Sequence, residues 1–500
     1  MLPPMSTRLR VSITALLLCA WLQPLAAVPP IPAAAPLALQ DCRLEQPQKL
    51  LALHAECGEL TVPENPAEPE GRQISLFIAR IPAVNRRAQP DPLFILAGGP
   101  GLAASAFYPG VAGAFGRVHR DRDIVLVDQR GTGRSQPLQC DVDEDGPAAD
   151  NQADEEWLHV MRECLAQLSR NSNLAYYTTS IAVRDLDAVR AALGYPGINL
   201  YGGSYGSRVA QHYLRRYPQH SRSVVLDGVV PPELALGPGI ALDAQAALLK
   251  IFARCRADAA CQGRFGDPEK DYRDLSTRLA SKPVLITVPD PRTGALRALT
   301  LGSAQLAAVL RLQSYSADQA AMLPLTLSLA NRDNNLQPLA AQFLLTTHSV
   351  SEAIAYGMHN SVVCAEDVPF YADVDRAQLA QTYLGTSQVD ALVGLCKFWP
   401  RGPMDEDLHA PLHSAVPALL LSGGADPVTP SEYGERARRG FTQALHITLP
   451  DQGHGQLLSP CMDRVMADFI EAASLSQLDT ACTKQARPSA FLLSLTGSAP

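Results

Sequence analysis

The stretch Ile198-Asn199-Leu200-Tyr201-Gly202-Gly203-Ser204-Tyr205-Gly206 joins a short apolar run to the motif Gly-x-Ser-x-Gly. In residues 207–217, which follow at once, apolar side chains recur at helical spacing and predict a helix with one buried face. A strand, a tight turn and a helix are the setting of a nucleophile elbow, in which a strained turn projects the serine hydroxyl above a sheet. We therefore expect Ser204 to be a nucleophile. The alternative is a glycine-rich loop that contains a serine by chance.

Other apolar runs, at residues 93–96, 124–127 and 224–226, do not alternate with polar residues, and each precedes a loop that contains glycine. Unbroken apolar runs suit strands that are buried on both faces of a parallel sheet. In an open α/β sheet, the loops at the carboxyl ends of the strands hold the ligand. Together with a helix expected at 181–193, these runs predict an α/β fold with a mostly parallel central sheet and helices on both faces.

The first part of the chain differs from this pattern. Residues 58–62 and 74–82 are expected to be a pair of strands joined by the proline- and glutamate-rich loop 63–71. Residues 28–41 are rich in proline and alanine, and we interpret them as a lead-in without regular structure.

A long segment, residues 233–414, separates these strands from two further apolar runs at 418–421 and 444–449. Within it, helical periodicity is clearest at 242–256, 304–312 and 338–345. We interpret 233–414 as a mainly helical cap inserted into the core. The core would then consist of residues 28–232 and of residues 415–500, which include an expected helix at 462–473 and a C-terminal segment that bears cysteines.

The N-terminus has the features of a secretory signal peptide, residues 1–27: Arg8 and Arg10, a short apolar run, and small residues at its end. The run is too short to span a bilayer as a helix, and no later stretch is apolar and long enough to do so. Cys19 could carry a lipid, but the preceding Leu18 is larger than a lipid-attachment site normally accepts. We expect an exported protein, periplasmic or secreted, without a membrane anchor.

Composition limits the choice of partners. The chain has 500 residues, 47% of them hydrophobic, and a formal net charge of −8 without a basic stripe. This length and hydrophobic content suit a globular protein with a large core. The acidic balance argues against nucleic acid or an anionic membrane surface as a partner.

Ten of the eleven cysteines lie beyond the signal peptide, and an even number in an exported chain favours disulfides. No Cys-x-x-Cys pair or Cys/His cluster has the spacing of metal ligands, so no metal site is expected. We expect each cysteine to pair with its nearest neighbour along the chain. The candidates are Cys42, Cys57, Cys140, Cys164, Cys255, Cys261, Cys364, Cys396, Cys461 and Cys482.

Ser204, Asp426 and His454 occur in the chain order of a catalytic triad on an α/β-hydrolase sheet, each in a loop after a strand. An imidazole can take the serine proton, and a buried carboxylate fixes the imidazole tautomer. Asp227 also follows a strand and is the alternative acid, whereas Asp451 is expected to be a turn residue only. The sequence therefore predicts an α/β-hydrolase fold with a large helical cap and an acyl-transfer site that needs no metal or organic cofactor.

The oxyanion of such a reaction needs backbone N–H donors. We expect them from Tyr205, directly after the nucleophile, and from Gly99 in Gly98-Gly99-Pro100-Gly101; the alternative for that loop is a plain turn. Arg130 is expected to tie loops together. The loop 131–133 lacks the third glycine of a dinucleotide fingerprint, so a nucleotide site is not expected.

Five motifs, Gly98 to Gly101, Asp128 to Ser135, Gly202 to Gly206, Asp426 and His454, resemble those of the prolyl iminopeptidase family of serine peptidases. The larger secreted tripeptidyl aminopeptidases, with a long cap and extra C-terminal cysteines, are the most similar. The resemblance covers most of residues 90–232 and 415–470. Ala97 departs from it, because many prolyl iminopeptidases carry histidine there, and this weakens the transfer of a narrow proline specificity.

The resemblance implies an exopeptidase that releases N-terminal residues (proline, alanine, dipeptides or tripeptides) from peptides through an acyl-enzyme. Such an enzyme holds the substrate ammonium with a carboxylate, and relatives use acids of the cap. Glu366 and Asp367 are the candidates here; the alternative is a solvated acidic turn beside Cys364. Two other functions are open at this stage: an esterase or other acyl hydrolase on the same fold, and a non-catalytic binding protein.

Overall fold

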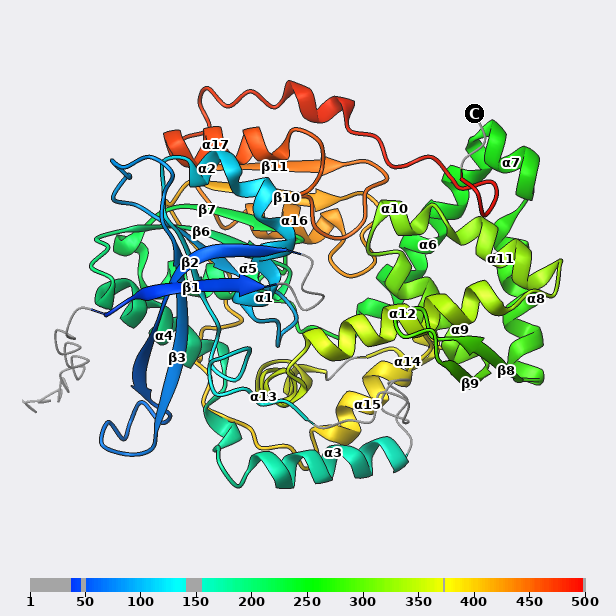
Figure 1. Ribbon diagram of the computed structural model, residues 1–500, viewed down its shortest axis with the longest axis horizontal. Helices are drawn as coiled ribbons and strands as arrows, with labels where there is room; N and C mark the ends of the chain where they lie inside the picture. The colour runs from blue at the N-terminus through cyan, green and yellow to red at the C-terminus, as the bar shows by residue number, and fades with distance from the viewer. Residues whose placement is uncertain (1–36, 46–50, 141–154, 372–373, 498–500) are drawn as a thin grey trace, which may run out of the picture.

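The computed structural model describes residues 37–45, 51–140, 155–371 and 374–497. The expected signal peptide and most of the expected lead-in lie outside these residues. Figure 1 shows a core built around a twisted sheet and, beside it, a largely helical cap.

Within the described residues, nine strands form one sheet. β1, β2, β3 and β5 pair antiparallel in that order, and all the remaining pairs are parallel. In spatial order the strands are β1 (Gln40–Glu45), β2 (Ala52–Pro63), β3 (Gln73–Ile81), β5 (Ile124–Val127), β4 (Leu93–Leu96), β6 (Ile198–Gly203), β7 (Ser221–Asp227), β10 (Ala418–Gly423) and β11 (Ala444–Leu449).

Helices cover both faces of this sheet, as the unbroken apolar runs predict. Along β4 and β5, successive side chains enter opposite hydrophobic clusters, since Phe94 and Val125 face one cluster whereas Ile95 and Leu126 face the other. One cluster contains side chains of α4 (Thr179–Ala192), α5 (Tyr205–Arg216) and α16 (Ser431–Arg438). The other contains side chains of α1 (Ala104–Val111), α2 (Gly116–His119) and α17 (Met462–Ala472).

One expectation at the N-terminus is wrong. Residues 40 and 41, assigned above to the irregular lead-in, begin β1, which pairs with β2 along its whole length. β2 itself starts at Ala52, earlier than expected. The cause is long-range: β1 is defined by its pairing with β2, which local composition does not show.

The segment between β7 and β10 contains most of the cap and has a hydrophobic cluster of its own. Part of it differs from a purely helical cap, because β8 (Val284–Pro289) and β9 (Leu296–Leu301) form an antiparallel hairpin. Its helices are α6 (Ile240–Ala257), α7 (Ala259–Phe265), α8 (Pro268–Ser281), α9 (Ser303–Gln313), α10 (Ala317–Ala320), α11 (Leu323–Asn331), α12 (Gln337–Ala353), α13 (Tyr356–Glu366), α14 (Arg376–Leu379) and α15 (Ser387–Leu395).

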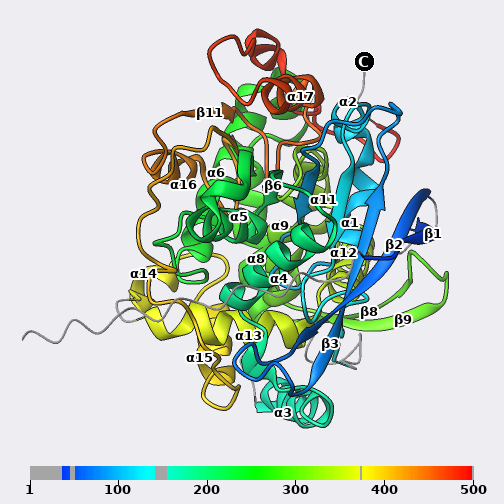
Figure 2. The same ribbon diagram turned by 90° about the vertical axis from the view of Figure 1, so that its left-hand side faces the viewer.

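Two of these helices, α13 and α15, contribute to the hydrophobic cluster of the core, together with α3 (Glu155–Leu168). In Figures 1 and 2 these three helices lie at the lower end of the molecule. The remaining short helices are η1 (Ala112–Phe115), η3 (Leu174–Tyr176), η4 (Pro218–His220), η5 (Val368–Phe370) and η6 (Ala481–Gln485).

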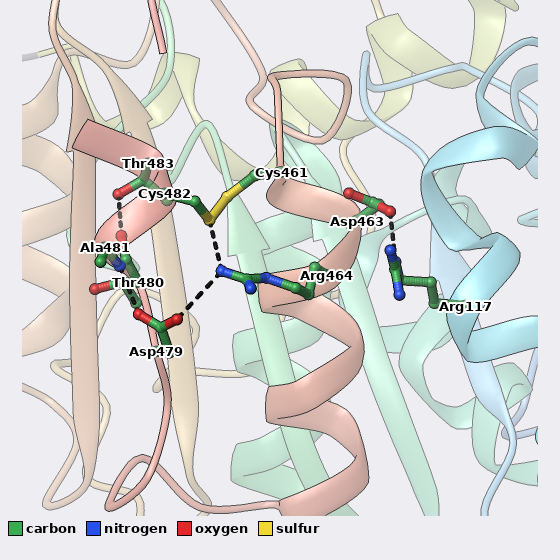
Figure 3. The surroundings of a disulfide bond; sticks show 9 residues. All are labelled: Arg117, Cys461, Asp463, Arg464, Asp479, Thr480, Ala481, Cys482 and Thr483. Atoms are coloured by element: carbon green, nitrogen blue, oxygen red, sulfur yellow. Dashed lines mark hydrogen bonds and ion pairs between the residues drawn. A yellow bond between two sulfur atoms is a disulfide. The ribbon is translucent and has the colours of Figure 1, made fainter. Parts of the chain in front are cut away.

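All ten described cysteines form disulfides between sequence neighbours, as predicted: Cys42–Cys57, Cys140–Cys164, Cys255–Cys261, Cys364–Cys396 and Cys461–Cys482. The last of these fastens the C-terminal segment to the start of α17, where Arg464 contacts both Cys482 and Asp479 (Figure 3). Beyond it the chain crosses to the cap, where Phe491 is buried in the cap cluster. The C-terminal segment therefore links the two parts of the molecule.

Candidate active site

Ser204 lies between β6 and α5, at a sharp turn of the backbone. Its φ of 55° is in a region that residues other than glycine rarely adopt. The flanking glycines are required by close packing: a Cβ on Gly202 would lie 2.4 Å from the Gly206 carbonyl oxygen, and one on Gly206 would lie 2.3 Å from that of Leu96. The turn therefore has the geometry of a nucleophile elbow.

Asp426 and His454, in the loops after β10 and β11, lie in direct contact. His454 Nδ1 is 2.8 Å from Asp426 Oδ2, and the side chain of His454 is 13% exposed. The other oxygen of Asp426 accepts backbone N–H bonds from Val428 and Thr429, both at 2.8 Å. The Thr429 hydroxyl lies 2.8 Å from Asp426 Oδ2 and 3.0 Å from His454 Nδ1. These bonds fix the carboxylate and, through it, the imidazole.

Asp227, the alternative acid, is placed differently. It is buried at the end of β7 and accepts hydrogen bonds from Tyr201 and from the backbone N–H groups of Gln456 and Leu457. Burial raises the pKa of Asp227 to about 6, against these hydrogen bonds, which lower it. Asp227 thus anchors the loop that carries His454, whereas Asp426 holds the imidazole itself.

The same strand end brings His454 and Ser204 close. The Ser204 N–H donates to the Asp227 carbonyl oxygen at 2.8 Å, and a Cβ on the next residue, Gly228, would lie 2.8 Å from His454 Cε1. Both side chains are in the described part of the chain, and no hydrogen bond joins Ser204 Oγ to His454 there. Catalytic hydrogen bonds of this kind are often long until substrate binds.

The environment of His454 favours its charged form. Burial lowers the pKa of His454, but the charge and hydrogen bond of Asp426, together with the charge of Asp227, outweigh burial, so that the pKa is raised above its ordinary value. A carboxylate in contact with the imidazole stabilises the imidazolium that forms when a base accepts a proton.

The loop Gly98-Gly99-Pro100-Gly101 packs against the elbow. A Cβ on Gly98 would lie 3.0 Å from the Cβ of Ser204, and Gly99 has a φ of +109° and precedes a cis proline. Tyr205 is buried in the first turn of α5, and its hydroxyl is 2.6 Å from that of Thr179. Both predicted oxyanion donors therefore belong to segments beside Ser204, and their role remains a prediction.

Cap residues contact the site on two sides, and the local sequence gives no signal for these contacts. The backbone N–H of His454 donates to the carbonyl oxygen of Tyr315 at 2.7 Å, and the two rings meet edge to face. On the other side, His359 Nδ1 is 3.1 Å from the Pro100 carbonyl oxygen, and Ala355 N–H donates to Gly101 at 3.0 Å. Cap residues thus support both the histidine loop and the glycine loop.

Glu366 and Asp367 lie at the end of α13 and are fully buried, so the alternative of a solvated turn is wrong. Both oxygens of Glu366 accept hydrogen bonds from Thr179, and burial raises the pKa of Glu366 to about 7, against the charge of Arg208 and these bonds. Asp367 Oδ1 is 2.9 Å from Arg208 and accepts the Leu236 N–H. Asp367 Oδ2 has no hydrogen-bond partner, which leaves one carboxylate oxygen available.

The remaining predicted residues have structural contacts. Arg130 is buried and pairs with Asp185 at 2.6 and 2.8 Å, and its guanidinium also bonds the carbonyl oxygens of Glu64 and Tyr176. It thus ties loops together as expected. In the described residues, no group of three or more His, Cys, Asp or Glu side chains could hold a metal ion, and none of the helices could cross a membrane.

Comparison with known proteins agrees with the fold. Residues 91–255 match the family described as alpha/beta hydrolase fold, and residues 381–482 match the family described as TAP-like protein. The chain has the α/β-hydrolase fold, residues 381–482 are similar to TAP-like proteins, and its enzymatic class is that of the serine hydrolases.

Curated relatives confirm the resemblance inferred from the motifs. The chain is 29% identical to the serine protease Hip1 of Mycobacterium tuberculosis over 80% of this chain and 81% of the relative. It is 26% identical to a tripeptidyl aminopeptidase of Streptomyces lividans, over 87% and 84% of the two chains. It is also 27% identical to carboxylesterase B of Mycobacterium tuberculosis, over 86% of each.

Proposed function

We propose that the protein is an exported serine aminopeptidase that releases one to three residues from peptides with a free N-terminus. The observation that carries the proposal is the Asp426–His454 pair beside the Ser204 elbow, 2.8 Å between Oδ2 and Nδ1, in a chain related to peptidases. The five disulfides support export, because such bonds persist in oxidising compartments.

In the proposed mechanism, Ser204 Oγ attacks the carbonyl carbon of the scissile bond while His454 Nε2 takes its proton. Asp426 keeps the Nδ1–H side of the ring oriented and stabilises the imidazolium. The backbone N–H groups of Tyr205 and Gly99 receive the oxyanion. Collapse of this intermediate breaks the C–N bond, and His454 returns the proton to the leaving amine.

The second half releases the N-terminal fragment from its ester with Ser204. Water attacks the acyl carbon as His454 takes a proton from it, and His454 then gives that proton to Ser204 Oγ. The fragment leaves as a carboxylic acid, and the enzyme regains its starting state.

The aminopeptidase specificity requires an acceptor for the substrate ammonium. Asp367 is the better suited of the two predicted acids, because one of its oxygens has no partner whereas both oxygens of Glu366 are bonded to Thr179. Arg208 balances one of the two carboxylates, which leaves the pair with a surplus negative charge when both are ionised. A buried carboxylate of this kind is stabilised by a cation that binds beside it.

An acyl hydrolase acting on esters is the second candidate, because carboxylesterase B covers as much of the chain as the peptidases do. Three chromogenic substrates separate the two: an alanyl or prolyl anilide, a tripeptidyl anilide, each with a free amine, and a short-chain acyl ester. Hydrolysis of a free-amine anilide that is lost in Ser204→Ala and on N-acylation of the substrate is the expected result. Cleavage of the ester alone would replace the proposal by an esterase function.

A further inference from the structure

Arg311, near the end of the cap helix α9, is a cation without a partner. Its Nε is buried and has no hydrogen bond, and the residue has neither an ion pair nor another hydrogen bond within the described residues. The fully buried Arg130 and Arg208 are paired with Asp185 and Asp367. Arg254, which is partly buried like Arg311, also has guanidinium nitrogens without a hydrogen bond, but it lies over the ring of Phe491. Arg311 is partly buried and has no ion pair, and a guanidinium in such a position is stabilised by an anion that binds beside it.

One flank of Arg311 reaches the catalytic histidine. Tyr315 follows Arg311 by four residues, just beyond the end of α9, and its carbonyl oxygen accepts the His454 N–H at 2.7 Å. The rings of Tyr315 and His454 have their centroids 5.3 Å apart. The end of α9 therefore lies directly over the loop that carries His454.

His359 connects the surroundings of Arg311 with the glycine loop. His359 on α13 contacts the Pro100 carbonyl oxygen. Burial lowers the pKa of His359, and the charge of Arg311 acts in the same direction, against Pro100 and Asp367, which raise it. His359 thus lies within the electrostatic reach of two groups of opposite charge, Arg311 and Asp367, and Asp367 Oδ2 has no hydrogen-bond partner.

Tyr383 is a second donor within the electrostatic reach of Arg311. The hydroxyl of Tyr383 is buried and has no hydrogen-bond partner. Burial raises the pKa of Tyr383, and the charge of Arg311 opposes this. A guanidinium and a neutral phenol, both unpartnered, form a donor set that suits a carboxylate better than any neutral group.

We propose that Arg311, with Tyr383, binds a carboxylate of the peptide substrate and makes the enzyme selective for anionic or short zwitterionic peptides. This inference rests on the proposed aminopeptidase function. The carboxylate comes either from an acidic side chain in the released fragment or from the C-terminus of a short peptide. With Asp367 as acceptor for the ammonium, the site would hold both charged ends of such a peptide.

Two substrate pairs distinguish these sources. Ala-Ala-Glu-anilide against Ala-Ala-Gln-anilide tests the side chain, and Ala-Ala-Ala-Ala against its C-terminal amide tests the chain end. In at least one pair, the wild-type enzyme should prefer the carboxylate by about tenfold in kcat/KM, the size expected of a hydrogen bond to a charged group. In Arg311→Gln that ratio should fall to about one through a higher KM for the anionic substrate, and Arg311→Lys should retain part of it.

Lys282→Gln, which removes an exposed cap cation, is the matched control and should keep the wild-type ratio. Absence of a preference in both pairs in the wild-type enzyme would overturn the proposal without any variant. An equal loss on anionic and neutral substrates in folded Arg311→Gln would also overturn it, since that pattern marks a structural role. If either result were found but Ser204 were still needed to cleave the neutral substrates, the Arg311 proposal would fail and the proposed aminopeptidase function would be retained.

Discussion

The carbonyl oxygen of Tyr315 accepts the backbone N–H of His454 at 2.7 Å, so a residue of the cap holds the loop of the core that carries the histidine. The histidine loop is thus held by two residues, Tyr315 of the cap and Asp227 at the end of β7. In this arrangement the cap helps to position the candidate base in addition to covering the sheet.

Gly453→Ala tests this support. A Cβ at residue 453 would lie 2.3 Å from the Tyr315 carbonyl oxygen, so the variant must push the cap and the histidine loop apart. We expect kcat to fall by about 10²-fold or more, because small displacements of catalytic groups have effects of that size, with a much smaller change in KM. Gly263→Ala, where the added Cβ meets no atom within 4 Å, is the control and should retain activity. Unchanged kcat in Gly453→Ala would show that the contact is dispensable.

Asp426→Asn and Asp227→Asn should differ in kind. Asp426 contacts His454 Nδ1, so its amide should favour the wrong tautomer and lower kcat by about 10⁴-fold, as in other triads. Asp227 bonds Tyr201 and the backbone of residues 456 and 457, so its amide should mainly lower the melting temperature. Measurements of kcat and of the melting temperature on both purified variants test which aspartate is the acid of the triad. A greater loss of kcat in Asp227→Asn would assign that role to Asp227.

The pH profile follows from the raised pKa of His454. A base must be neutral to accept the serine proton, so activity is lost as the pH falls through its pKa. Because Asp426 and Asp227 raise that pKa above 6.5, the acid limb of kcat/KM should have its midpoint above 6.5. Asp426→Asn removes the charge that most raises the pKa of His454 and leaves the burial that lowers it. The acid limb of its residual activity should therefore have its midpoint at a lower pH. A midpoint that does not shift in Asp426→Asn would mean that the acid limb does not report the ionisation of His454.

Asp367→Asn should raise KM for free-amine peptides by about tenfold while changing KM for N-blocked esters little, because only the former present an ammonium. Glu366→Gln should act in the same direction and more weakly, since Thr179 already occupies both of its oxygens. Steady-state kinetics on the two substrate types measure both effects. Equal changes on the two types would remove these acids from ammonium binding.

Local sequence determined the main elements of the core, because periodicity and glycine placement are properties of neighbouring residues. The apolar runs at 93–96, 124–127 and 444–449 are β4, β5 and β11, and the run before Gly202 is β6. The chain order of Ser204, Asp426 and His454 followed from the same local reading. The cysteine pairs were also predictable, since each joins neighbours along the chain.

Only the tertiary structure decided which groups meet. It placed Asp426 rather than Asp227 on the imidazole, buried Glu366 and Asp367 against Arg208, and brought Tyr315 of the cap to His454. It also left Arg311 without a partner. The reason is physical: a hydrogen bond or an unpaired charge depends on residues far apart in the sequence, and the local patterns of a chain carry no record of which distant groups its packing brings together.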